Sequence, residues 1–291
     1  MVEPYPNILV FDSGVGGLTI VHEVRQHCPS VGIDYLSDNA GFPYGTKSEA
    51  FVIDRCVHLI QQTLELSDNP IDLVVVACNT ASTLALPKLR EVLDLPIIGV
   101  VPAIKPAAEQ SANQYFGVLA TPGTVNRPYT KQLIREFASH CTVVSVGSSE
   151  LVQIAENKLR GVEPNKEALN AILAPLLTIS RDNPTPEKLD TLVLACTHFP
   201  WLKTDIEAVL ARPIQVIDSG LAIARRVSSI LNLDNSQERI SNVSATKQGV
   251  YWYTQPPGYS DSRPAATTSK TNFTLKNRPL ELAFAAGLRE Q

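Results

Sequence analysis

One seven-residue segment occurs twice in the chain, and each copy ends in a cysteine. The sequence DLVVVAC at 72–78 is matched by DTLVLAC at 190–196, and a polar turn and a helix-like stretch follow both copies. A second pair of similar segments, at 9–14 and 118–123, ends in glycine. Two similar lobes that face each other are the simplest explanation. The alternative is chance similarity between strand–helix units.

The repeated segments belong to a longer alternation of short apolar runs and amphipathic stretches. Continuous apolar runs such as 73–76 are typical of strands that are buried on both faces of a parallel sheet. The amphipathic stretches between them, among them 47–66 and 125–138, predict helices. This order predicts an α/β fold with open, doubly wound sheets. Strands are expected at 7–11, 33–36, 72–77, 97–101, 116–120, 142–146, 190–195 and 214–217.

A length of 291 residues also favours two lobes. The first lobe is expected to comprise residues 1–103 and 213–291, and the second residues 104–212. The lobes would be related by an approximate two-fold axis, with the active site in the cleft between them. After Leu233 the predicted elements are a β-element at 249–254, a loop rich in Pro, Ser and Thr at 255–272, and an apolar segment at 280–288 that docks back on the body.

Composition excludes several classes of protein. The net charge of −4 and a pI of about 5.8, without any dense Lys/Arg run, disfavour nucleic-acid binding. No apolar run reaches membrane-spanning length, and no basic residue precedes Arg25, so a cytoplasmic location is expected and a membrane protein is not. Five cysteines without a CxxC pair indicate free thiols rather than disulfides or a cysteine-rich zinc site.

Polar clusters follow four of the predicted strands. They begin at Asp12, Cys78, Thr121 and Cys196. Open α/β sheets bind ligands beyond the carboxyl ends of their strands, so two facing lobes would bring Cys78 and Cys196 to one cleft from opposite sides. This arrangement suits a racemase, which removes a proton from one face of a carbon and returns a proton to the other.

Cysteine suits this task because its thiol pKa lies near neutrality and falls at a helix N-terminus. Both cysteines precede a predicted helix. Because the reaction needs one proton acceptor and one proton donor, one cysteine is expected to be a thiolate and the other a thiol. His198, two residues after Cys196, is interpreted as a partner of that thiol or of the substrate, and a purely structural histidine is the alternative. The remaining cysteines, Cys28, Cys56 and Cys141, are expected to be small packing residues.

The glycine-rich segment DSGVGGLT at 12–19 is not a dinucleotide-binding motif, because Thr19 stands where GxGxxG requires glycine. No GxxxxGK[ST] phosphate-binding loop is present either. Gly14, Gly16 and Gly17 still permit close approach of a ligand to the backbone, and N–H groups before a helix suit a carboxylate. We therefore interpret the segment as substrate-binding.

Five motifs together resemble the glutamate racemase family. They are VFDSGVGGL at 10–18, FPYG at 42–45, ACNTAS at 77–82, AT with GT at 120–124, and ACTHFP at 195–200. They fall between residues 8 and about 226, in the family's order. The resemblance implies an enzyme that interconverts L- and D-glutamate in a bacterial cytoplasm without pyridoxal phosphate or metal, and that supplies peptidoglycan synthesis.

The resemblance also implies roles for individual residues. Cys78 would act on the D-isomer with help from Asp12, and Cys196 on the L-isomer with help from His198. Glu156 matches the glutamate that supports this histidine, although GSSE at 147–150 departs from the family pattern and makes Glu150 a competitor. The implied substrate contacts are Asp12, Ser13, Tyr44, Gly45, Asn79, Thr80, Thr121, Thr124, Thr197 and His198.

Some members of the family are activated by a cell-wall precursor or form homodimers, and both properties are carried over only as implications of the resemblance. An aspartate or hydantoin racemase is the nearest alternative function. More distant alternatives are a hydrolase with a triad of Cys196, His198 and a carboxylate, a metal site at Cys78, Cys196 and His198, and a two-lobed binding protein without catalysis.

Overall fold

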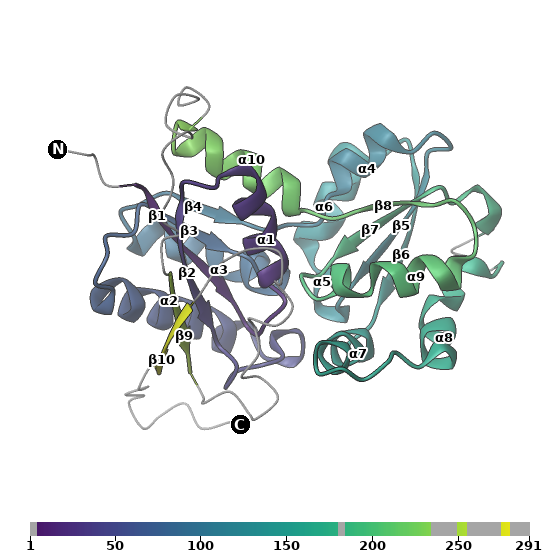
Figure 1. Ribbon diagram of the computed structural model, residues 1–291. Coiled ribbons are helices and arrows are strands. Elements are labelled where there is room, and N and C mark those ends of the chain that lie inside the picture. Colours follow the sequence, from purple (N-terminus) through teal and green to yellow (C-terminus); the bar gives the residue numbers. More distant parts are fainter. Residues whose placement is uncertain (1–4, 180–183, 234–248, 255–274, 280–291) are drawn as a thin grey trace.

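The computed structural model describes residues 5–179, 184–233, 249–254 and 275–279, which form two lobes that lie side by side (Figure 1). Each lobe contains a parallel β-sheet with helices on both faces, as the α/β prediction expected. The strand order is β10-β9-β2-β1-β3-β4 in the first sheet and β6-β5-β7-β8 in the second.

The bounds of the elements are as follows. The first lobe contains β1 (Asn7–Asp12), α1 (Leu18–His27), β2 (Gly32–Ser37), the 3₁₀ helix η1 (Tyr44–Thr46), α2 (Glu49–Leu66), β3 (Leu73–Val76), α3 (Asn79–Val92), β4 (Ile97–Gly99), α10 (Gly220–Ile230), β9 (Gly249–Tyr253) and β10 (Leu275–Pro279). The second lobe contains α4 (Ile104–Gln110), β5 (Tyr115–Ala120), α5 (Pro122–Asn126), α6 (Pro128–Phe137), β6 (Thr142–Gly147), α7 (Glu150–Leu159), α8 (Lys166–Leu177), η2 (Pro186–Lys188), β7 (Thr191–Ala195), η3 (Phe199–Leu202), α9 (Lys203–Leu210) and β8 (Gln215–Ile217).

The repeated segments occupy equivalent strands of the two sheets. The order β2-β1-β3-β4 in the first sheet corresponds to β6-β5-β7-β8 in the second. The segment 72–78 carries β3 and the segment 190–196 carries β7, while the glycine-ending pair carries β1 and β5. The two-lobe interpretation of the repeat is confirmed, and both cysteines follow the carboxyl ends of equivalent strands.

The apolar runs form strands because both faces of each sheet are covered. In β3, Val74 and Val76 pack in one core cluster with residues of α2 and α3. Leu73 and Val75 point to the opposite face, where the core includes residues of α1 and α10. Side chains that alternate between two buried faces leave no position for a polar residue, which explains the uninterrupted run.

Two features differ from the sequence-based expectation. The helix expected over 125–138 is two helices, α5 and α6, because Arg127 adopts an extended conformation before Pro128. The boundary expected at residue 213 precedes β8, yet β8 pairs with β7, so the chain returns to the first lobe after Ile217. The division of the chain into folding domains stays a prediction.

The tail contributes to the first sheet. The β-element expected at 249–254 is β9, which pairs in parallel with β2. The segments 255–272 and 280–288 lie outside the described residues. Within the described ranges, no helix has both the length and the apolar character needed to cross a membrane.

The two buried faces of β7 lead to a stability prediction. Leu192 is fully buried in the core of the second lobe. We expect Leu192→Ala to lower the free energy of unfolding by about 2–5 kcal/mol, because it removes apolar contacts and leaves a cavity. Leu221, at the start of α10, is 39% exposed. Leu221→Ala should therefore change the free energy of unfolding by less than about 0.5 kcal/mol. Urea unfolding followed by circular dichroism measures both, and equal losses would contradict the assigned burial.

Candidate active site

A cavity that is partly open to solvent is lined by residues from both lobes, and the empty space in it and at its mouth amounts to about 450 Å³. Most of the sequence-predicted substrate contacts meet there: Ser13, Tyr44, Gly45, Asn79, Thr80, Thr121, Thr124, Thr197 and His198. Both Cys78 and Cys196 line the same cavity. Asp12 and Glu156 are absent from its lining and lie behind it, where they contact residues that do line it.

Sequence reasoning missed several lining residues. They are Phe42, Pro43, Thr46, Ser149, Val152 and Ala195. Phe42 and Pro43 are part of the FPYG motif, so that motif could have identified them. Ser149 and Val152 lie at the start of α7, where no local pattern marks a ligand site.

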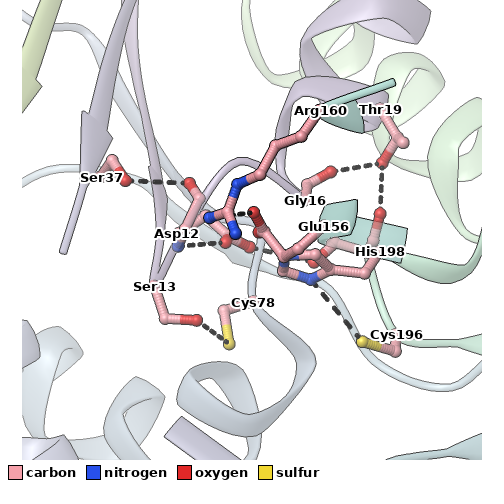
Figure 2. A network of polar contacts seen from close by, with 12 residues as sticks. Asp12, Ser13, Gly16, Thr19, Ser37, Cys78, Glu156, Arg160, Cys196 and His198 are labelled. Atoms are coloured by element: carbon pink, nitrogen blue, oxygen red, sulfur yellow. Dashed lines mark hydrogen bonds and ion pairs between the residues drawn. The ribbon is translucent and has the colours of Figure 1, made fainter. Parts of the chain in front are cut away.

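Cys78 is the residue before α3, at the end of β3. The hydroxyl oxygen of Ser13 lies 3.8 Å from its sulfur (Figure 2). Burial raises the pKa of the Cys78 thiol to about 12, and the negative charge of Asp12 adds to this effect, while the backbone N–H of Ala81 opposes it. The helix N-terminus does lower the pKa of Cys78 through the Ala81 N–H, as expected, but desolvation outweighs this single group and the net pKa is raised. Cys78 is a thiol at neutral pH.

Cys196 lies in a different environment. It follows β7, and the residues after it form η3 instead of an α-helix, so the imidazole of His198 is the neighbouring charged group. The Cys196 sulfur is 4.0 Å from His198 Nδ1, and His198 Nε2 is 2.8 Å from Glu156 Oε1 (Figure 2).

These partners change the protonation of His198. Burial alone would lower the pKa of His198, but the hydrogen bonds to Cys196 and Glu156 and the nearby negative charges raise it to about 10. The imidazole is therefore a cation at neutral pH. A cation at this distance stabilises negative charge on the Cys196 sulfur.

The structure distinguishes between the two glutamates that the sequence left in competition. Glu156 lies on the buried face of α7, is 6% exposed and contacts His198. Glu150, in the first turn of the same helix, is exposed. Arg160, one turn beyond Glu156, lies 3.7 Å from its second carboxylate oxygen. The carboxylate at His198 is thus Glu156.

Asp12 connects the two lobes. Its side chain is fully buried, and one oxygen accepts a hydrogen bond from the Gly14 N–H at 2.7 Å. The other oxygen accepts from the hydroxyl of Thr197, in the second lobe, at 3.0 Å. Burial raises the pKa of Asp12, and the charge of His198 and these two hydrogen bonds oppose the rise. The negative charge of Asp12 raises the pKa of Cys78, whereas the hydroxyl of Ser13 lies beside the Cys78 sulfur.

The glycines of the glycine-rich segment pack the two lobes together. Gly14, Gly16 and Gly17 do not line the cavity, whereas Ser13 of the same segment does. A Cβ atom on Gly16 would lie 2.4 Å from Nδ1 of His198 and 2.7 Å from the hydroxyl of Thr197. The absence of a side chain at Gly16 therefore allows the first lobe to pack against the end of β7. The substrate-binding interpretation of the segment stays a prediction.

One wall of the cavity is rich in hydroxyl groups. Thr121 Oγ1 lies 3.0 Å from Thr124 Oγ1 and 3.5 Å from Thr80 Oγ1. Asn79 Nδ2 is buried and has no hydrogen-bond partner among the described residues. An unpaired buried donor is costly, so a ligand oxygen at this position would be stabilised. The hydroxyl of Tyr44, by contrast, donates to Asp38 at 2.6 Å and is already paired.

The described residues contain no group of three or more His, Cys, Asp or Glu side chains that could hold a metal ion. The hypothesis of a metal site at Cys78, Cys196 and His198 thus receives no support. Cys28 and Cys56 are buried in hydrophobic clusters, and Cys141 packs against another, as expected for packing residues.

Comparison with known proteins gives a consistent result. The sequence pattern of the Asp/Glu/Hydantoin racemase family matches residues 18–227. A glutamate racemase from Klebsiella pneumoniae is 49% identical over 229 residues, which cover 79% of this chain and 78% of the relative.

Solved structures are also similar. Escherichia coli glutamate racemase, in complex with L-glutamate and the activator UDP-MurNAc-ala, matches with a TM-score of 0.81 and 42% identity over 94% of this chain and 98% of that one. Glutamate racemase isoform RacE1 from Bacillus anthracis matches with a TM-score of 0.78 and 27% identity, over 96% and 99% of the two chains.

The chain therefore belongs to the Asp/Glu/hydantoin racemase family. It is an amino acid racemase, an isomerase, and the resemblance to glutamate racemases is confirmed. Cys196, His198 and Glu156 do form a triad-like row, but the hydrolase and binding-protein alternatives do not account for this family membership or for Cys78 in the same cavity.

The charge of His198 leads to a pH prediction. We expect its imidazole to titrate near pH 10 instead of at its ordinary value of 6.5. Because the folded-state pKa is raised, the stabilisation is complete below about pH 6.5 and disappears as the pH rises through about 10. Nitrogen NMR of labelled histidine measures the midpoint. Glu156→Gln should lower this midpoint, because it removes a carboxylate charge, and a wild-type midpoint near 6.5 would contradict the assigned contacts.

Proposed function

We propose that this chain interconverts L- and D-glutamate by proton transfer between the substrate Cα and two cysteines, Cys78 and Cys196. One observation carries the proposal: the two thiols follow equivalent strands of different lobes and line one cavity. The identity of the relatives supports glutamate as the substrate. Asp12, His198 and Glu156 complete the proposed catalytic group.

The charge of the His198 imidazole beside Cys196 suits one direction of the reaction. In this direction Cys196 acts as the base and removes the Cα proton of L-glutamate, while Cys78 carries a proton. Cys78 then donates its proton to the opposite face of the carbanion, which forms D-glutamate. The cycle leaves Cys196 protonated and Cys78 as the thiolate, the state that acts on D-glutamate. Each transfer uses only groups of the chain itself.

The lining of the cavity suits a dicarboxylate. Its polar lining includes the Asn79 amide, the His198 imidazole and several hydroxyl groups, and no Lys or Arg side chain belongs to it within the described ranges. The unpaired Nδ2 of Asn79 and the three threonines Thr80, Thr121 and Thr124 can donate hydrogen bonds to carboxylate oxygens. Ser13, Gly45, Thr197 and His198 are proposed as the remaining contacts.

The product fits a biosynthetic role. D-Glutamate supplies peptidoglycan synthesis, and the bacterial cytoplasm is the expected compartment. The Escherichia coli relative was solved with the activator UDP-MurNAc-ala, and activation of this chain by a similar cell-wall precursor is part of the proposal, as is a homodimer.

The two-base mechanism predicts the effect of removing either thiol. Cys78→Ala and Cys196→Ala should each abolish turnover of L- and D-glutamate, because each removes the proton donor or acceptor on one face. Cys141→Ala, which changes a partly buried thiol outside the cavity, should retain activity. Circular dichroism of glutamate with purified protein and no added cofactor measures racemisation.

The same reaction in D₂O, with the isotope content of the product measured by mass spectrometry, distinguishes the mechanism. Product formed from either enantiomer should carry deuterium at Cα, because the donating thiol exchanges with solvent. Retention of the substrate protium would indicate one shuttling base and would refute the two-base mechanism. An unchanged dichroism signal at high enzyme concentration would refute the proposed function.

The contact between Glu156 and His198 provides a matched pair of variants on one helix. Glu156→Gln should lower kcat by roughly 10²-fold, because the loss of the carboxylate weakens the charge that holds His198 as a cation beside Cys196. Glu150→Gln removes an exposed carboxylate from the same helix and should leave kcat unchanged. Initial rates in both directions measure the effect, and similar rates for the two variants would contradict the assignment of Glu156.

A further inference from the structure

A buried carboxylate lies behind the cavity, outside the catalytic group. Asp38 comes directly after β2 and is inaccessible to solvent. It accepts hydrogen bonds from the hydroxyl of Tyr44 at 2.6 Å and the hydroxyl of Thr254 at 2.7 Å. Two nitrogens of the Arg55 guanidinium also donate to it, one to each oxygen. Four donors from three separate parts of the chain thus converge on one carboxylate.

This carboxylate supports one side of the cavity. Residues 42–46, which we name the wall loop, all line the cavity. The ring of Phe42 packs against His198 with 5.6 Å between ring centroids, and a Cβ atom on Gly45 would contact the side chain of Thr121 at 3.2 Å. The wall loop therefore contacts the second lobe at two points.

Asp38 also connects to the catalytic strand. Its backbone N–H donates to the carbonyl of Asp12 at 2.9 Å, and its carbonyl accepts from the N–H of Gly41 at 3.0 Å. A displacement of Asp38 would consequently disturb its contact with Asp12 and the turn at Gly41 that leads into the wall loop. Arg55 lies on α2 and is buried against the same carboxylate.

The Thr254 hydroxyl is supplied by the residue that directly follows β9. Thr254 follows β9, which pairs with β2 in a register that places Tyr253 opposite Ser37. The Thr254 hydroxyl accepts from the Ala40 N–H at 2.9 Å, and the Thr254 N–H lies 3.2 Å from Asn39 Oδ1. Thr254 therefore bonds to three consecutive residues that lead into the wall loop.

We infer that Asp38 is a positioning residue for the wall loop, and that Thr254 makes β9 part of the support of the active site. The inference rests on the proposed function, since it assigns the wall loop to the glutamate pocket. A buried carboxylate that loses one donor must reorganise or remain underpaired. Small displacements of groups that hold a substrate reduce the rate strongly, so the effect reaches the reaction.

The test is Thr254→Val, which keeps the shape of the side chain and removes the hydroxyl. We expect KM for both enantiomers to rise by about 3- to 10-fold. This is at most the effect of losing one hydrogen bond to a charged group. Hydrogen–deuterium exchange across residues 39–46 should be faster than in the wild type. Thr254→Ser restores the hydroxyl and should restore both values.

Thr63→Val is the matched control. The Thr63 hydroxyl is fully buried in α2 and donates to the carbonyl of Leu59 at 2.8 Å, away from the wall loop. Its loss should leave KM and the exchange of 39–46 unchanged, whatever it does to the melting temperature. A purely structural role of Thr254 would produce this same pattern.

A folded Thr254→Val protein with wild-type KM would overturn the inference, and so would a raised KM without faster exchange. If Thr254→Val does not fold, Arg55→Lys, which keeps the charge but loses the two-pronged contact, is examined by the same two measurements with the same criteria. Wild-type protein that fails to racemise glutamate would overturn the proposed function, and the exchange comparison, which needs no substrate, would then decide the link between Thr254 and the loop.

Discussion

The two lobes meet at the carboxylate of Asp12, and the geometry of the site depends on this contact. A buried carboxylate is strongly disfavoured unless hydrogen bonds replace the water it has lost. One oxygen finds its donor in its own lobe, at Gly14, and the other in the second lobe, at Thr197. Separation of the lobes would leave that second oxygen unpaired. Because Gly16 has no side chain, the close approach of the lobes is also sterically possible.

Much of the fold could be predicted because the signals were local or repeated. The apolar runs of β3 and β7 needed no knowledge of partners, since a strand buried on both faces is apolar at every position. The repeat then identified Cys78 and Cys196 as equivalent, and the sheet orders agree. The tail strand β9 was also expected from its aromatic run, although its parallel pairing with β2 was not.

The rest depended on contacts between residues that are distant in sequence. Nothing local distinguishes Glu156 from Glu150, because only the orientation of α7 decides which of them is buried against His198. The pKa of Cys78 could not be predicted for a related reason: a helix N-terminus is visible in sequence, whereas burial beside Asp12 is not. The partners of Asp38 likewise come from segments that fold together only in three dimensions.

The two thiols occupy equivalent positions in the fold but have unequal neighbours, a hydroxyl at Cys78 and a cationic imidazole at Cys196. This asymmetry has a strict thermodynamic limit. Enantiomers have the same free energy in solution, so the equilibrium constant of a racemase equals one and kcat/KM must be the same in both directions. The unequal neighbours can therefore give the two directions different kcat and different KM, but not a different kcat/KM. An enzyme of this design favours neither isomer at equilibrium, however different its two half-sites become.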